Sequence, residues 1–87
     1  MKADYVNKII TQIYADDRNA RFKYPVLREG QSLYNAAYKY VPSVCEKVTG
    51  TVKDPFYNNG SIDMFMDAVY DYLNNQDEET LKDISKK

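Results

Sequence analysis

Residues 3–15 read ADYVNKIITQIYA, and this stretch decides the fold because its large apolar side chains recur with the period of an α-helix. Four side chains occupy positions i, i+3, i+4 and i+7, which share one face of a helix. They are Val6, Ile9, Ile10 and Ile13. The alternation typical of a β-strand fails at the adjacent Ile9 and Ile10, so the stretch predicts an amphipathic helix with one buried face.

Residues 16–29 break this pattern. Four polar residues follow one another as Asp16-Asp17-Arg18-Asn19, and Pro25 disfavours the helical conformation at Tyr24. We therefore expect a connection of about a dozen residues, which is long for a helical bundle. It carries a mixture of cations and aromatic rings: Arg18, Arg21, Phe22, Lys23, Tyr24 and Arg28.

Two further helices are predicted after this connection. The first begins at about residue 28 or 30 and ends at residue 40, because its apolar positions again have helical spacing. Its buried stripe consists of Leu33, Ala36, Ala37, Tyr40 and Val41. Pro42 fits the first turn of a short helix over residues 43–48, where its missing N–H is harmless. Gly50 is placed to end that helix in the left-handed conformation.

The pair Asp54-Pro55 repeats a helix start signal, with Asp as the N-cap and Pro at the first helical position. We expect a single helical turn there, which includes Phe56 and Tyr57. Ser61 is then expected to cap a helix over residues 62–74. One face of this helix is apolar and consists of Ile62, Phe65, Met66, Val69, Tyr72 and Leu73.

Together these elements predict an all-α fold, a small compact bundle of four to five short helices. A chain of 87 residues, with 44% hydrophobic and 29% charged residues, has enough apolar surface for one domain with one core. We place this helical domain at residues 1–76. Residues 77–87 have only Leu81 and Ile84 as large apolar side chains, so they predict a loosely ordered C-terminal tail or a short helix.

The composition excludes several classes of protein. Histidine is absent and Cys45 is the single cysteine, which excludes a His-based catalytic triad, a zinc finger and an internal disulfide. A net charge of −1 excludes a histone-like basic protein. No apolar run approaches the ~20 residues of a membrane-spanning helix. The N-terminus also lacks the apolar stretch of a signal peptide, so we expect no association with a membrane.

No group of residues in the sequence has the pattern of a catalytic or metal site. Cys45 shares the apolar side of its short helix with Val48, which predicts a buried thiol rather than a nucleophile. Asp63, Asp67 and Asp71 recur at i, i+4 and i+8, and we interpret them as the solvated face of their helix. The spacings of a calcium loop and of a glycine-rich phosphate loop do not occur. We therefore expect a protein that is not an enzyme, with no catalytic residue, bound metal or cofactor.

Charge is distributed unevenly along the chain. Residues 1–50 carry eight Lys and Arg and five Asp and Glu side chains, whereas residues 51–87 carry four and eight. The segment 18–28 mixes cations with aromatic rings, as surfaces that contact phosphates and stack on bases do. Four cations in a chain of net charge −1 nevertheless give a weak field. Three interpretations of the segment stay open: a solvated connection, a protein-binding edge and a nucleic-acid contact.

Nine tyrosines are the most unusual feature of the composition, and they cannot all be buried in a chain of 10.1 kDa. Tyr34 and Tyr38 are four residues apart and lie beside the buried line of their predicted helix, so we expect them at its rim. Exposed tyrosine is enriched at protein interfaces. The alternative is that these tyrosines are half-buried side chains that cover a small core.

Two short motifs carry a resemblance. Residues 28–35 contain Arg28, Gly30, Gln31 and Asn35 in the pattern R-x-G-Q-x-x-x-N, and residues 50–56 read GTVKDPF. Over about residues 28–73, the chain resembles small proteins encoded by tailed bacteriophages, which share an R-x-G-Q-x-x-x-N helix and a G-T-x-x-D-P-F element. The resemblance implies a phage gene product in the cytoplasm of the host bacterium. It brings no assigned activity and no functional residues.

Small phage proteins without catalytic groups commonly act by binding a host macromolecule. We therefore expect a non-enzymatic protein that binds a host protein, for example as an inhibitor of a host enzyme or defence system. The alternative is a nucleic-acid-binding accessory protein that uses the segment 18–28. The candidate partner-binding residues are Arg18, Arg21, Phe22, Lys23, Tyr24, Arg28, Tyr34 and Tyr38.

Overall fold

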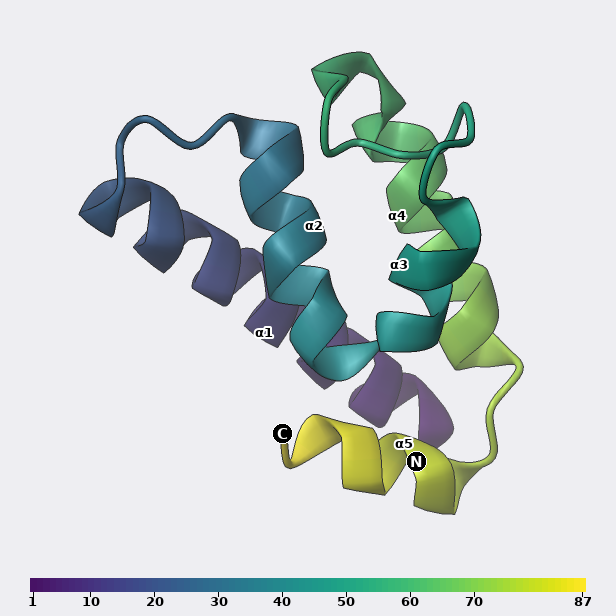
Figure 1. The fold of residues 1–87 in the computed structure, drawn as a ribbon. Coiled ribbons are helices and arrows are strands. Elements are labelled where there is room, and N and C mark those ends of the chain that lie inside the picture. Colours follow the sequence, from purple (N-terminus) through teal and green to yellow (C-terminus); the bar gives the residue numbers. More distant parts are fainter.

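Five α-helices and one short 3-10 turn, η1, make up the computed structural model, which describes all residues from 1 to 87 (Figure 1). The elements are α1 (Lys2–Lys23), α2 (Glu29–Tyr40), α3 (Pro42–Val48), η1 (Asn59–Ser61), α4 (Ile62–Asn74) and α5 (Glu78–Ser85). No strand is present, which confirms the predicted all-α bundle. None of the helices combines the length and the apolar composition needed to cross a membrane.

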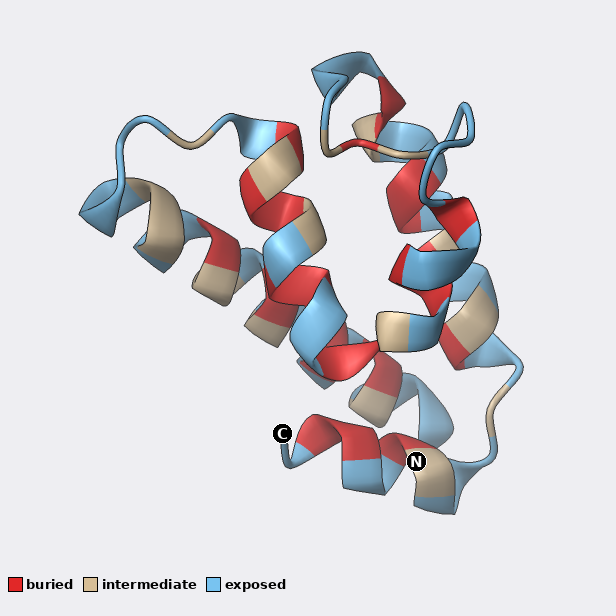
Figure 2. Cartoon of the chain, viewed as in Figure 1, coloured by how far each residue is buried: buried red, intermediate tan, exposed pale blue.

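Helix α1 is the element around which the core forms. Its side chains pack against α2, α4 and α5, while α3 packs against α2 and α4. The predicted stripe of α1 is buried from Val6 to Ile13, and Figure 2 shows that buried residues recur along the helices. Each of the five helices contributes to one hydrophobic core, with Leu33, Phe65 and Leu73 among its fully buried members.

The prediction of a dozen-residue connection after α1 is wrong, because α1 continues to Lys23 and only residues 24–28 connect it to α2. Hydrogen bonds within α1 and with α2 hold polar residues of the second half of α1 in place. Asp17 is buried and accepts two hydrogen bonds from Arg21 one turn later. The hydroxyl of Ser32 donates to the backbone oxygen of Asp17 at 3.1 Å, and this bond ties α1 to α2.

The predictions for α2 and α3 are confirmed. Helix α2 covers Glu29–Tyr40, and Pro42 lies in the first turn of α3. Gly50 follows α3 with a φ of 79°, in the left-handed region that favours glycine.

The segment between α3 and α4 matches its prediction in part. The Asp54 carboxylate accepts from the backbone N–H of Phe56, as an N-cap does, and the N–H of Asn58 donates to the carbonyl of Pro55 at 3.2 Å, which closes one turn without forming a helix. The same carboxylate also accepts from the N–H of Gly50. Ser61 does not cap α4 with its side chain, although α4 has the predicted bounds. The Ser61 hydroxyl donates to the carbonyl of Val52 at 2.8 Å and is buried, so it fastens the loop instead.

Of the two alternatives predicted for residues 77–87, the structure has the short helix, α5, and this helix packs in the core. Asp77 caps this helix by accepting from the N–H of Thr80. Leu81 is completely buried and Ile84 is nearly so, and both belong to the common core. Helix α5 packs on α1, so the two chain ends lie at the same end of the molecule (Figure 1).

Candidate functional site

The N-terminus of α2 is held against the loop that precedes η1 by a group of contacts that we call the clasp (Arg28, Gly30, Pro55, Phe56 and Asn59). The guanidinium of Arg28 donates to the carbonyl of Phe56 at 2.9 Å. The backbone N–H of Gly30 donates to the side-chain oxygen of Asn59 at 2.8 Å. A Cβ atom at Gly30 would overlap the carbonyl oxygen of Pro55, so only glycine allows this approach.

The clasp brings together residues of the R-x-G-Q-x-x-x-N motif and of the G-T-x-x-D-P-F motif. Arg28 and Gly30 come from the first motif, and Pro55 and Phe56 come from the second. In this structure these residues join a helix start to a loop. These four motif residues therefore have a structural explanation that requires no ligand.

Beyond the clasp, a series of touching aromatic rings runs along the edge of α2, and we call it the aromatic row (Tyr38, Tyr34, Phe56 and Tyr57). Ring centroids are 6.3 Å apart for Tyr38 and Tyr34, 5.4 Å for Tyr34 and Phe56, and 4.8 Å for Phe56 and Tyr57. Arg28 completes the row, because its guanidinium carbon lies 5.9 Å from the centre of the Tyr57 ring. Tyr57 is 80% exposed, so the row ends in an aromatic ring that water surrounds.

Hydrogen bonds fix the orientation of two rings of the row. The hydroxyl of Tyr34 lies 2.8 Å from the hydroxyl of Thr49, and the ring also stacks on Phe65 in the core. The hydroxyl of Tyr38 donates to the carboxylate of Glu46 at 2.8 Å, which raises the pKa of Tyr38. Tyr38 is partly exposed and Tyr34 is half-buried, as the prediction of a rim position requires.

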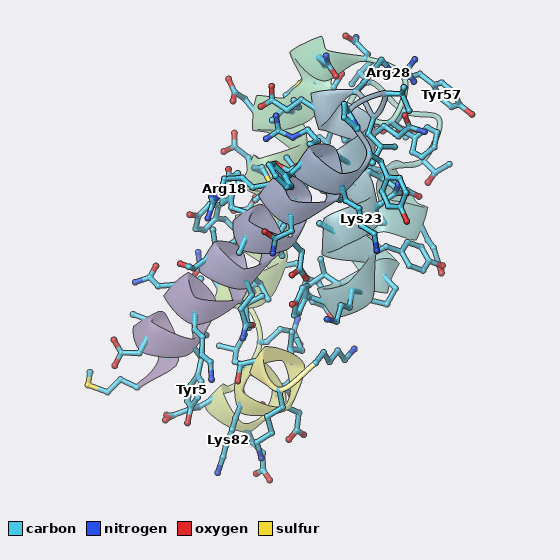
Figure 3. The ribbon with its side chains drawn as sticks, turned by 90° about the vertical axis from the view of Figure 1, so that its left-hand side faces the viewer. Tyr5, Arg18, Lys23, Arg28, Tyr57 and Lys82 are labelled. Atoms are coloured by element: carbon cyan, nitrogen blue, oxygen red, sulfur yellow. The ribbon has the colours of Figure 1, made fainter.

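A second exposed group lies at the turn between α1 and α2, and we call it the corner (residues 22–28). Phe22 and Val26 are almost fully exposed, and Tyr24 is about half exposed. The ammonium of Lys23 lies 5.6 Å from the centre of the Tyr24 ring. The corner ends at Arg28 and therefore joins the aromatic row, and Figure 3 shows Lys23, Arg28 and Tyr57 on the same side of α1.

The predicted basic segment does not form one continuous surface. Arg21 pairs with the buried carboxylate of Asp17 at 2.9 Å, and this hydrogen bond raises the pKa of Arg21. Arg18 projects from the opposite side of α1 to Lys23 (Figure 3), as their separation of five residues on a helix of 3.6 residues per turn requires. Of this segment, Arg28 alone contacts the aromatic row, whereas Lys23 lies against Tyr24 and Arg21 against Asp17.

Sequence reasoning missed Val26, Phe56 and Tyr57 as surface residues. The motif Asp54-Pro55 suggested a helical turn, and nothing local to it indicates that the loop lies against the start of α2. The one available signal was the tandem of two aromatic residues followed by Asn58-Asn59-Gly60, a sequence typical of an exposed turn.

The structure confirms that Cys45 is a buried core thiol. It is completely buried, and burial raises its pKa to about 12, so the reactive thiolate is strongly disfavoured. Asp63, Asp67 and Asp71 are exposed on α4, as expected of a solvated face. No three His, Cys, Asp or Glu side chains lie together in an arrangement that could hold a metal ion.

Comparisons with known proteins found no matching family model, no similar curated protein and no similar solved structure. The function of the chain therefore has to be inferred from the geometry of its surface.

Proposed function

We propose that this chain is a non-enzymatic binding protein that recognises a protein partner through the aromatic row and the adjoining corner. One observation carries the proposal: the touching rings of the row end in the exposed Tyr57, which lies beside the guanidinium of Arg28. Tyrosine and arginine dominate the energetics of protein interfaces. They bury large areas and still offer hydrogen-bonding groups to the partner.

The rigidity of this surface supports the same proposal. Arg28 is held by the carbonyl of Phe56, and the loop is held by the hydrogen bond between Gly30 and Asn59. Side chains that are already ordered lose less conformational entropy when a partner binds. The clasp thus orders the backbone next to Tyr57, whose ring contacts Phe56 and Arg28.

The charges of the surface define the chemistry of the partner. Lys23 and Arg28 lie on the side of the molecule that carries Tyr57 (Figure 3), and neither forms an ion pair within the chain. Between them, Val26 exposes an apolar side chain to water. A complementary partner has an apolar pocket with acidic residues at its edge.

Nucleic-acid binding receives less support from the same residues. It would use the four cations of segment 18–28, but Arg21 is neutralised by Asp17, and Arg18 projects away from Lys23 and Arg28. The remaining cations supply few phosphate contacts, in a chain whose net charge is −1. The aromatic row is therefore better suited to a protein interface than to a surface that binds the phosphate backbone of a nucleic acid.

The resemblance to phage proteins suggests where this partner would be found. We propose a host bacterial protein as the partner, such as a host enzyme or a component of a defence system, and the host cytoplasm as the place of binding. This part of the proposal rests on the motif residues 28–35 and 50–56 alone.

The proposed function is tested by capture from a bacterial lysate on the immobilised chain, with and without nuclease. A protein partner is retained after nuclease treatment and is released by an excess of the free chain. Loss of all specific retention after nuclease treatment would instead favour the nucleic-acid alternative.

A further inference from the structure

A groove of about 640 Å³ lies between α3 and α4, on a surface that the proposed protein interface does not use. Helix α3 supplies one wall and α4 the other, and the two helices pack side by side (Figure 1). The loop residues Thr51–Lys53 also line the groove. Its volume is within the ~300–1,000 Å³ that small-molecule sites occupy in proteins.

The lining of this groove divides into an apolar part and a cationic part. Val44 and Val48, which are 6% and 5% exposed, line the groove together with the half-buried Tyr72, and Val52 adds a side chain that is 76% exposed. Lys47 and Lys53 also line the groove, and neither forms an ion pair within the chain.

One carboxylate, that of Asp71, lines the same groove and opposes the two lysines. It lies beyond ion-pairing distance of both ammonium groups, because the four ion pairs of the chain involve other residues. The groove therefore keeps a net positive charge over an apolar surface. An anionic ligand with an apolar body matches both properties.

We propose that this groove binds a small organic anion, with its apolar body against Val44, Val48 and Tyr72 and its anionic group between Lys47 and Lys53. The dimensions favour a small molecule over a peptide helix. Helix α3 has 7 residues, so the wall that it forms is only about 10 Å long. A docked helix of three turns would need a wall about half as long again.

The test uses 8-anilinonaphthalene-1-sulfonate as an anionic probe and the uncharged N-phenyl-1-naphthylamine as its matched control. The proposal expects saturable fluorescence binding of the sulfonate to one site and binding of the uncharged analogue that is at least about tenfold weaker. Equal binding of the two probes, or no saturable binding of the sulfonate, would overturn the proposal.

Matched variants locate the site. The double variant Lys47→Gln/Lys53→Gln is expected to weaken sulfonate binding at least about tenfold, whereas Lys82→Gln/Lys86→Gln removes the same charge from exposed positions of the C-terminal region and should leave it unchanged. The proposal is wrong if both double variants bind alike. Amide chemical shifts of the unaltered chain give a second readout, which must change around Val44, Val48 and Tyr72. Chemical-shift changes confined to the aromatic row would also contradict binding of the sulfonate in the groove.

Discussion

The ion pair of Arg21 and Asp17 gives Arg21 a structural role that the sequence around it does not indicate. The carboxylate of Asp17 is only 3% exposed, and Arg21 covers it with two hydrogen bonds. In the sequence, Arg21 is one of four cations in a polar segment. In the fold, it neutralises a buried charge at the junction of α1 and α2.

Replacing Arg21 by alanine therefore destabilises the protein. The variant leaves the buried Asp17 carboxylate without its partner, at an expected cost of about 1–3 kcal/mol, reduced because water still reaches part of the Arg21 site. Urea unfolding followed by circular dichroism measures the loss. The control Arg18→Ala removes an exposed cation of the same helix and is expected to change stability by less than about 0.5 kcal/mol. Equal stability of the two variants would show that the pair is not a structural contact.

Two buried acidic groups predict how stability depends on alkaline pH. Burial raises the pKa of Cys45 from 9.0 to about 12, and burial together with the hydrogen bond to Asp16 raises that of Tyr40 from 10.0 to about 12. Well below pH 9 both groups keep their protons in the folded and the unfolded chain. As the pH rises toward 12, only the unfolded chain loses these protons, so the free energy of unfolding falls.

The variant Tyr40→Phe tests this dependence, because it removes one of the two groups and keeps the ring in the core. Its free energy of unfolding should fall less steeply between pH 10 and 12 than that of the unaltered chain. Urea midpoints measured over this range report the two slopes. The same slope for both proteins would contradict the role of the Tyr40 hydroxyl.

At the scale of the elements, apolar periodicity predicted α2, α3, α4 and the first half of α1 because each buries one continuous stripe. It missed the second half of α1, since the contact that orders this half is made by the polar Asp17 and Ser32. It also undervalued α5, where two apolar residues are enough because both Leu81 and Ile84 insert into the core. Interactions between residues distant in sequence therefore determine the elements that apolar periodicity did not predict.

For Gly30→Ala, the contacts of the clasp predict a change in stability that is opposite in sign to the change that helix propensity predicts. Alanine favours a helix over glycine by about 1 kcal/mol, but its Cβ at this position would overlap the backbone of Pro55. We expect Gly30→Ala to lower stability by about 1–2 kcal/mol, because the loop has to move. Thermal unfolding measures the change. Asn35→Ala, at an exposed position of the same helix, is the control and should be neutral or stabilising. Stabilisation by Gly30→Ala would mean that the clasp does not form.

Helix α5 makes a second prediction at this scale. Leu81→Ala should cost about 2–5 kcal/mol, because it leaves a cavity where a fully buried side chain packs in the core. A loosely attached tail would tolerate the change. Denaturant unfolding distinguishes these outcomes, with the exposed Lys82→Ala as the neighbouring control.

For the whole molecule, the sequence predicted the fold class but only parts of the candidate surface. Tyr34, Tyr38, Tyr24 and Arg28 could be named from composition and helical spacing. The assembly that joins them could not, because Tyr57 reaches Arg28 only through a loop fixed by hydrogen bonds across 28 and 29 residues of sequence. The separation of Arg18 from Lys23 likewise depends on α1 continuing as a helix beyond residue 16.

The proposed function requires that Tyr57 anchors a protein partner, and matched tyrosine variants test this requirement. Tyr57→Ser alters the exposed end of the aromatic row, whereas Tyr70→Ser alters a partly exposed tyrosine on α4. The measurement is the affinity of each folded variant for the lysate protein that the unaltered chain retains after nuclease treatment. We predict that Tyr57→Ser weakens this affinity at least about tenfold and that Tyr70→Ser leaves it unchanged. Equal affinity of the two variants, or retention that disappears with nuclease, would contradict this requirement.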